Sequence, residues 1–136
     1  MSPQVEFGYN EQIAPPAPFV SIELRSPASP ANSKPDQMTA LIDTGAYGSV
    51  IPNSLVEKLN LCMVSEVEVG DYEASKEEDF KTKSVYSVHL NIPNLPFIIV
   101  EVTSFETEDY AIIGRNVINE WLLTLDGPKL KGLINI

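Results

Sequence analysis

The residues with the clearest chemical potential lie in the segment Leu-Ile-Asp-Thr-Gly-Ala at 41–46. Two apolar residues bring the carboxylate of Asp43 to a turn, where Gly45 lets the backbone reverse at low cost and Thr44 offers a hydroxyl beside the carboxylate. A carboxylate at the end of an apolar strand is typical of functional sites. The same pattern also fits an aspartate that closes a turn by hydrogen bonding to its own backbone. The segment alone leaves both interpretations open.

A second segment, Ile-Ile-Gly-Arg-Asn at 112–116, follows far along the chain. Together the two segments resemble the retropepsins, the aspartic proteases of retroviruses and of their cellular and bacterial relatives. That family pairs an Asp-Thr/Ser-Gly turn with a later apolar-apolar-Gly motif that opens a C-terminal helix. The resemblance covers residues 19–136, so we expect a retropepsin-like aspartic protease domain there, preceded by a Pro-rich N-terminal arm at residues 1–18.

Short segments in which apolar and polar residues alternate predict the strands that must hold these motifs. Strands are expected at residues 19–24, 37–42, 64–69, 85–92, 97–102, 122–125 and 132–136. Short helices are expected at 54–60, where Ser54 and Glu57 have capping-box spacing, and at 115–121, where Val117, Ile118 and Trp121 have helical spacing. The pattern predicts a mainly β domain. The resemblance implies a closed, acid-protease-like barrel with two short helices and one lobe per chain.

One aspartate is not enough for the reaction that the resemblance implies. Hydrolysis of a peptide bond by activated water needs a base that activates the water and an acid that protonates the carbonyl oxygen. Two adjacent carboxyl groups fill both roles because they share one proton. The chain has a single Asp-Thr-Gly and is too short for two lobes. The second carboxylate must therefore come from a second copy of the chain in a symmetric homodimer.

The resemblance assigns roles to the residues of the two motifs. Asp43 carries the catalytic carboxylate, Thr44 bonds to the partner's turn, and Gly45 exposes its carbonyl group to a bound peptide. Substrate contacts are expected from Ala46, Tyr47 and Gly48. Structural support is expected from Ile113, Gly114, Arg115 and Asn116. In viral relatives the arginine of this helix bonds a carboxylate just after the turn. Here Tyr47 stands in that place, so we expect Arg115 to bond backbone carbonyl groups or Tyr47 instead.

The polar segment at 70–84 resembles the flap, a hairpin that closes over the substrate. Substrate contacts in it are expected from Tyr72, Ala74 and Ser75. The segment departs from the viral pattern because it has no glycine cluster at its tip and carries a run of charged residues, Glu73, Lys76, Glu77, Glu78 and Asp79. A solvated hairpin without a role in closure is the alternative.

The composition disfavours several other kinds of site and partner. The formal net charge of −10 disfavours nucleic acids and anionic membrane surfaces. One cysteine, Cys62, and one histidine, His89, cannot form a standard zinc site, and the sequence has no glycine-rich phosphate loop. We therefore expect no metal and no cofactor. The absence of a signal pattern, of a long apolar run and of a cysteine pair predicts a cytoplasmic protein.

The sequence thus predicts an aspartic endopeptidase that hydrolyses peptides or proteins with water activated by the paired Asp43 carboxylates of two subunits. The alternative is a catalytically silent, dimeric module with the same fold that binds peptides or takes part in assembly. The intact Asp-Thr-Gly favours the enzyme, whereas the altered flap and Tyr47 favour the silent module.

Overall fold

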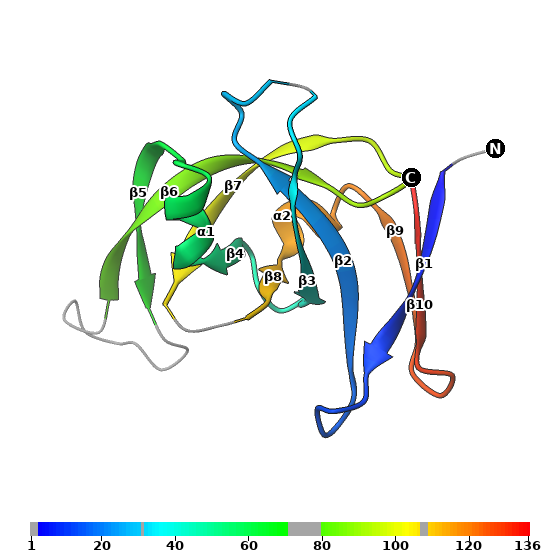
Figure 1. Ribbon diagram of the computed structural model, residues 1–136. Coiled ribbons are helices and arrows are strands. Elements are labelled where there is room, and N and C mark those ends of the chain that lie inside the picture. Colours follow the sequence, from blue (N-terminus) through cyan, green and yellow to red (C-terminus); the bar gives the residue numbers. More distant parts are fainter. Residues whose placement is uncertain (1–2, 31, 71–79, 107–108) are drawn as a thin grey trace.

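The computed structural model describes residues 3–30, 32–70, 80–106 and 109–136. Within these ranges the chain forms ten β-strands and two short helices (Figure 1). The elements are, in order, β1 (Gln4–Asn10), β2 (Ala17–Arg25), β3 (Asp36–Ile42), β4 (Ser49–Pro52), α1 (Asn53–Lys58), β5 (Met63–Gly70), β6 (Phe80–Asn91), β7 (Ile98–Phe105), β8 (Ala111–Ile113), α2 (Arg115–Ile118), β9 (Leu122–Asp126) and β10 (Lys131–Asn135).

The strands join in one sheet in the order β5-β6-β7-β4-β8-β3-β2-β1-β10-β9. Because β6 pairs with β2 as well as with β7, the strands from β6 to β2 close into a barrel. The predicted mainly β fold, with a closed barrel and two short helices, is confirmed. Apolar side chains from strands all around the barrel form its buried core, among them Ile22, Leu24, Leu90, Val102 and Ile113. Burial of this apolar surface is the main source of stability.

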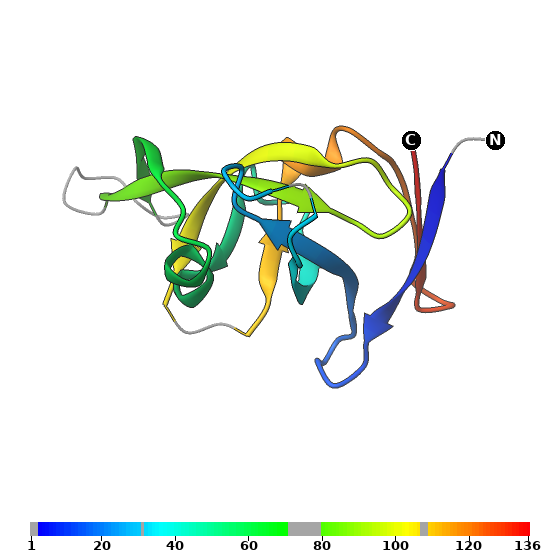
Figure 2. The same ribbon diagram turned by 45° about the horizontal axis from the view of Figure 1, so that its top comes forward.

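Three strands, β1, β10 and β9, extend the sheet beyond the barrel, and both chain ends lie on that side (Figure 2). β1 pairs with β10 along most of its length and with β2 at its end. The ring of Phe7 covers Gly132, where an added Cβ would lie 2.1 Å from the ring. The stretch expected to be a lead-in arm therefore contains a strand of the sheet. The division of the chain at residue 18 stays a prediction about domains.

Both helices are shorter than predicted. α1 follows directly from β4, and its N-cap is Pro52 with no side-chain cap hydrogen bond, so the capping box of Ser54 and Glu57 does not form. The fixed φ of the proline already sets the chain at the helix start. α2 ends at Ile118 because the chain must turn to enter β9, and Trp121 therefore lies beyond the helix. No helix of the described residues is long and apolar enough to cross a membrane.

The hairpin of β5 and β6 projects from the barrel on the side opposite to the chain ends (Figure 1). Its second strand begins at Phe80 rather than at residue 85 as predicted, because β6 stays paired with β5 as far as Gly70. The tip, residues 71–79, lies outside the described residues.

Candidate active site

The Asp-Thr-Gly turn follows β3 directly, and hydrogen bonds fix it on both sides of Asp43. The backbone N–H of Asp43 donates to the carbonyl oxygen of Ile113 at 2.9 Å, which continues the parallel pairing of β3 with β8. Asp43 Oδ1 accepts a hydrogen bond from the N–H of Gly45 at 2.9 Å. A Cβ at Gly45 would lie 3.2 Å from this oxygen, so any other residue at this position would crowd the carboxylate. Asp43 as a residue is half-buried, and this hydrogen bond ties its carboxylate to the backbone of the turn.

The hydrogen bond from Gly45 to Asp43 is what a purely turn-closing aspartate would make. Asp126, in the β9–β10 turn, makes a comparable bond, with its Oδ1 accepting from the N–H of Lys129 at 3.2 Å. The surroundings differ, because Gly45 and the residues that follow it line a cavity, whereas Asp126 does not line that cavity. At Asp43, as at Asp126, only one carboxylate oxygen is engaged among the residues that the structure describes. The second oxygen is therefore available to a water molecule, a substrate or a second carboxyl group.

The segment at 111–116 packs against the turn, and Gly114 is its point of closest approach. A Cβ at Gly114 would lie 2.2 Å from the carbonyl oxygen of Gly48 and 2.8 Å from that of Ala46. The next two N–H groups along the chain donate to the carbonyl oxygens of Ala46 and Tyr47 at 2.7 and 3.2 Å. Because these neighbours are backbone atoms, only a glycine fits here without moving the turn. The two sequence motifs thus form one structural unit.

Ser49 connects the two motifs through its side chain, and sequence analysis missed it. Its Oγ accepts a hydrogen bond from the N–H of Gly114 at 3.0 Å and donates to Asn116 Oδ1 at 2.8 Å. Asn116 Nδ2 in turn donates to the carbonyl oxygen of Glu101 at 3.0 Å. Ser49 is the one fully buried polar residue in the described part of the chain, with 3% of its surface exposed. The signal that could have revealed it is a lone hydroxyl at the start of the apolar run Ser-Val-Ile-Pro.

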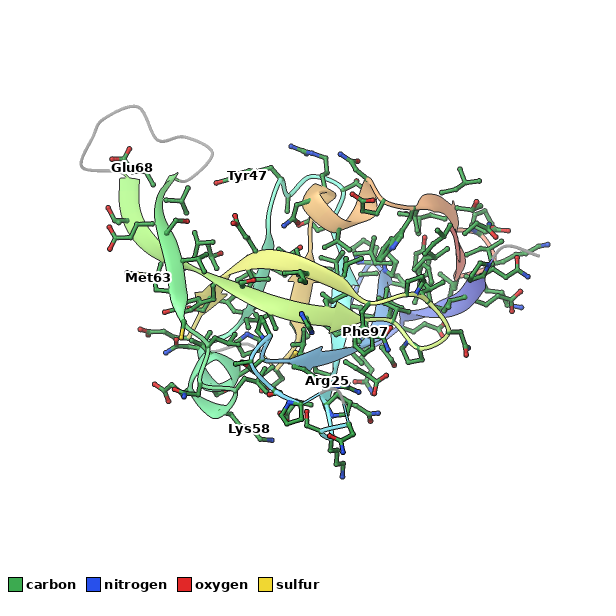
Figure 3. The ribbon with its side chains drawn as sticks, turned by 90° about the horizontal axis from the view of Figure 1, so that it is seen from above. Arg25, Tyr47, Lys58, Met63, Glu68 and Phe97 are labelled. Atoms are coloured by element: carbon green, nitrogen blue, oxygen red, sulfur yellow. The ribbon has the colours of Figure 1, made fainter. Side chains whose placement is uncertain are left out.

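Arg115 and the exposed residues of the turn complete the site. Arg115 Nη1 donates to the carbonyl oxygen of Thr44 at 3.0 Å, so a backbone carbonyl group, and not Tyr47, is its hydrogen-bond partner. Thr44 is exposed, and Tyr47 is 63% exposed. The side chain of Tyr47 extends from the turn toward the end of the β5–β6 hairpin that carries Glu68 (Figure 3). A contact of Thr44 with a partner subunit stays a prediction.

A cavity of about 540 Å³ opens next to the turn. The described residues that line it are Gly45, Ala46, Tyr47, Gly48, Ser49, Val50, Ser65, Glu66, Val67, Val85, Glu101, Val102, Thr103 and Asn116. The structure therefore brings the turn residues expected to bind substrate together around one hollow, with the hairpin as its other wall. The hairpin residues expected to bind substrate, Tyr72, Ala74 and Ser75, lie outside the described residues. Among the described residues no cluster of three or more His, Cys, Asp or Glu side chains could hold a metal ion.

No protein-family model and no curated protein matches the sequence. The structure, however, is similar to the crystal structure of a retropepsin-like aspartic protease from Rickettsia conorii, with a TM-score of 0.66 over 99% of this chain and 92% of that chain. This chain has a retropepsin-like fold. The sequence identity to that protease is 12%, so the likeness concerns the fold alone.

Other solved structures resemble the retropepsin-like barrel less closely. The EIAV protease complexed with an inhibitor gives a TM-score of 0.47 at 15% identity, over 76% of this chain and 86% of that chain. The retroviral protease-like domain of Ddi1 from Leishmania major gives 0.43 at 11% identity, over 79% of this chain and 81% of that chain.

Proposed function

We propose that the protein is an aspartic endopeptidase that works as a symmetric homodimer, with the Asp43 of each subunit supplying one carboxyl group to a shared site. The observation that carries the proposal is the position of Asp43 in a retropepsin-like fold. Its carboxylate is held by Gly45 at the end of an apolar strand, next to a cavity large enough for a substrate side chain. The packing of Gly114 and Ser49 against the turn supports the proposal because it fixes the backbone around that carboxylate.

In the proposed dimer the two Asp43 carboxyl groups share one proton. The ionised group takes a proton from a water molecule as the water attacks the peptide carbonyl carbon, and the protonated group donates to the carbonyl oxygen. The tetrahedral intermediate then breaks down: the carboxyl group that took the proton of the water gives it to the leaving nitrogen, and the other carboxylate takes a proton back from a hydroxyl group of the intermediate. No covalent bond forms between enzyme and substrate. An extended peptide presents its side chains to alternate faces, so the cavity beside the turn receives one of them.

The test is cleavage of a proteome-derived peptide pool by the purified chain between acidic and neutral pH, read by mass spectrometry. Asp43→Asn keeps an oxygen that can accept from the Gly45 N–H, so it removes the ionisable group and leaves the turn bonded. Asp126→Asn is the matched control, since Asp126 makes a similar turn hydrogen bond away from the cavity. We expect the wild type and Asp126→Asn to cleave, and Asp43→Asn not to cleave.

The oligomeric state must be measured in the same samples, for example by analytical ultracentrifugation. A folded, dimeric wild type that cleaves no peptide at any pH would contradict the proposal and favour the silent peptide-binding or assembly module. Cleavage by Asp43→Asn at the wild-type rate would show that the activity comes from another group.

A further inference from the structure

The cavity beside the turn has two walls of different origin. The turn supplies one wall through the residues that follow Asp43, and β5, β6 and β7 supply the other. Its volume of about 540 Å³ lies within the range of roughly 300–1,000 Å³ that is usual for ligand pockets. Because the cavity begins at Gly45, it lies where a side chain close to the scissile bond of an extended peptide would enter.

The lining of the cavity combines apolar walls with negative charge. Three valines contribute to the walls: Val50, Val67 and Val85. Two lining residues, Glu66 and Glu101, carry carboxylates, whereas none of the described lining residues is lysine, arginine or histidine. In the described part of the chain neither carboxylate takes part in an ion pair. A side chain that enters the cavity therefore meets an apolar surface and carboxylates that no ion pair engages among the described residues.

Glu101 stands on the face of β7 that is turned to the cavity. Its neighbour Val102 is 1% exposed and faces the barrel core, so strand alternation places the Glu101 side chain on the opposite face. On β6 the residue paired with Glu101 is Ser87, which shares a face with the cavity-lining Val85. The carbonyl oxygen of Glu101 accepts a hydrogen bond from Asn116 Nδ2, and Oδ1 of the same side chain accepts one from Ser49 Oγ. The carboxylate is thus carried by the framework that fixes the Asp-Thr-Gly turn.

Two basic side chains of nearby elements are engaged elsewhere. Lys83 Nζ, on β6, donates to the carbonyl oxygen of Ser104 at 2.8 Å. Arg115 Nη1, on α2, donates to the carbonyl oxygen of Thr44 at 3.0 Å. Both cations thus bond backbone carbonyl groups, and among the described residues neither forms an ion pair with Glu101.

We propose that the cavity is a subsite that selects a lysine or arginine side chain of the substrate, with Glu101 as the specificity-determining residue and Glu66 as a second carboxylate at its edge. The long methylene stem of either side chain packs on the valines while its charged head reaches a carboxylate. This inference rests on the proposed endopeptidase function, because it names the substrate class of the same site. It predicts cleavage of peptides that carry a basic residue at one fixed position near the scissile bond.

The first experiment aligns the cleavage sites found in the proteome-derived peptide pool. We expect lysine and arginine to be enriched at one position. The best arginine peptide is then compared with the same peptide carrying citrulline, which keeps the shape of the side chain and removes its charge. For the wild type we expect kcat/KM to fall roughly tenfold on this exchange, and to fall less at high salt because screening weakens the ion pair.

Three variants test how much each carboxylate contributes to the preference for arginine over citrulline. Glu101→Gln is expected to abolish most of the difference between arginine and citrulline, and Glu66→Gln to reduce it partly. Glu68→Gln is the matched control, because Glu68 is exposed on the same strand as Glu66 and does not line the cavity. It should keep the full preference. Cleavage with no basic enrichment, or a preference that survives in the Glu66→Gln/Glu101→Gln double variant, would overturn the subsite while the protease activity stood.

A wild type that is dimeric and cleaves nothing would contradict the proposed function, and the subsite is then tested by binding. The probes are fluorescein-labelled, valine-rich decapeptides that carry one arginine or one citrulline at each position in turn, measured by fluorescence anisotropy. Tighter binding of one arginine peptide that is lost in Glu101→Gln would support the subsite without catalysis. Equal binding of the arginine and citrulline peptides at every position would overturn it.

Discussion

Replacing Ser49 with alanine is expected to destabilise the fold by about 1–3 kcal/mol, the usual cost of leaving a buried polar group without a partner. The serine is 3% exposed, and its Oγ accepts from the N–H of Gly114 at 3.0 Å. Alanine removes this acceptor and little volume, so the unpaired N–H dominates the loss. Asn116 also loses a donor, but its side chain is exposed and its oxygen can be hydrated instead.

The assay is urea denaturation of both proteins at one fixed concentration, because the stability of a dimer depends on concentration. Thermal unfolding gives a second readout, in which 1 kcal/mol corresponds to a shift in Tm of about 3–5 °C for a chain of this length. Ser54→Ala is the matched control. Ser54 is exposed on α1 and makes no side-chain cap hydrogen bond, so its replacement should change stability by less than about 0.5 kcal/mol.

A double-mutant cycle shows whether the stability change comes from the proposed hydrogen bonds. Ser49 and Asn116 are in direct contact, so their replacements by alanine should be non-additive, with a coupling energy of about 0.5–3 kcal/mol. The reasoning is refuted if Ser49→Ala is as stable as Ser54→Ala, or if the Ser49 and Asn116 changes add without coupling.

Three further predictions follow from the geometry. Gly114→Ala, whose Cβ would lie 2.2 Å from a backbone oxygen, should lower the free energy of unfolding in urea by about 3 kcal/mol or more. Gly8→Ala is its control: nothing lies within 4 Å of the added Cβ, so the change should be neutral or stabilising by up to about 1 kcal/mol. Equal effects of the two changes would contradict the steric argument. Lys58→Ala should lower the free energy of unfolding by less than about 1 kcal/mol, and by less still at high salt, because the ion pair of Lys58 with Asp36 is on the surface. A larger loss of stability would contradict the description of this ion pair as a surface pair. A carboxyl pair that shares one proton should give a bell-shaped dependence of kcat/KM on pH, and a profile with a single limb would contradict it.

The two chemical motifs could be predicted from the sequence because each is short and local. In the Asp-Thr-Gly turn and in the Ile-Ile-Gly segment, a few consecutive residues are enough to indicate the local backbone conformation. The family resemblance places the two segments in one site. Ser49 was missed because its role depends on Gly114 and Asn116, which follow more than sixty residues later. A single buried hydroxyl has no periodicity by which a sequence pattern could reveal it.

The strand β1 was missed for a different reason. Val5, Phe7 and Tyr9 do alternate with more exposed residues, which is a strand signal. The prolines that follow favour an extended segment without strand pairing, so the whole stretch was predicted to be a lead-in arm. The strand β10, with which β1 pairs, lies at the opposite end of the chain. The shortness of α2 shows a similar limit, because Trp121 has helical spacing but the path into β9 ends the helix first.

The central claim is that two Asp43 carboxyl groups from two subunits form one active site, and mixed dimers test it most directly. Wild-type chain and Asp43→Asn chain are mixed at constant total concentration, allowed to exchange subunits, and assayed for peptide cleavage. If both carboxyl groups are required, activity follows the square of the wild-type fraction, so an equal mixture keeps about one quarter of the activity. Activity that falls in direct proportion to the wild-type fraction, leaving about one half in an equal mixture, would contradict the account, because each chain would then carry its own site.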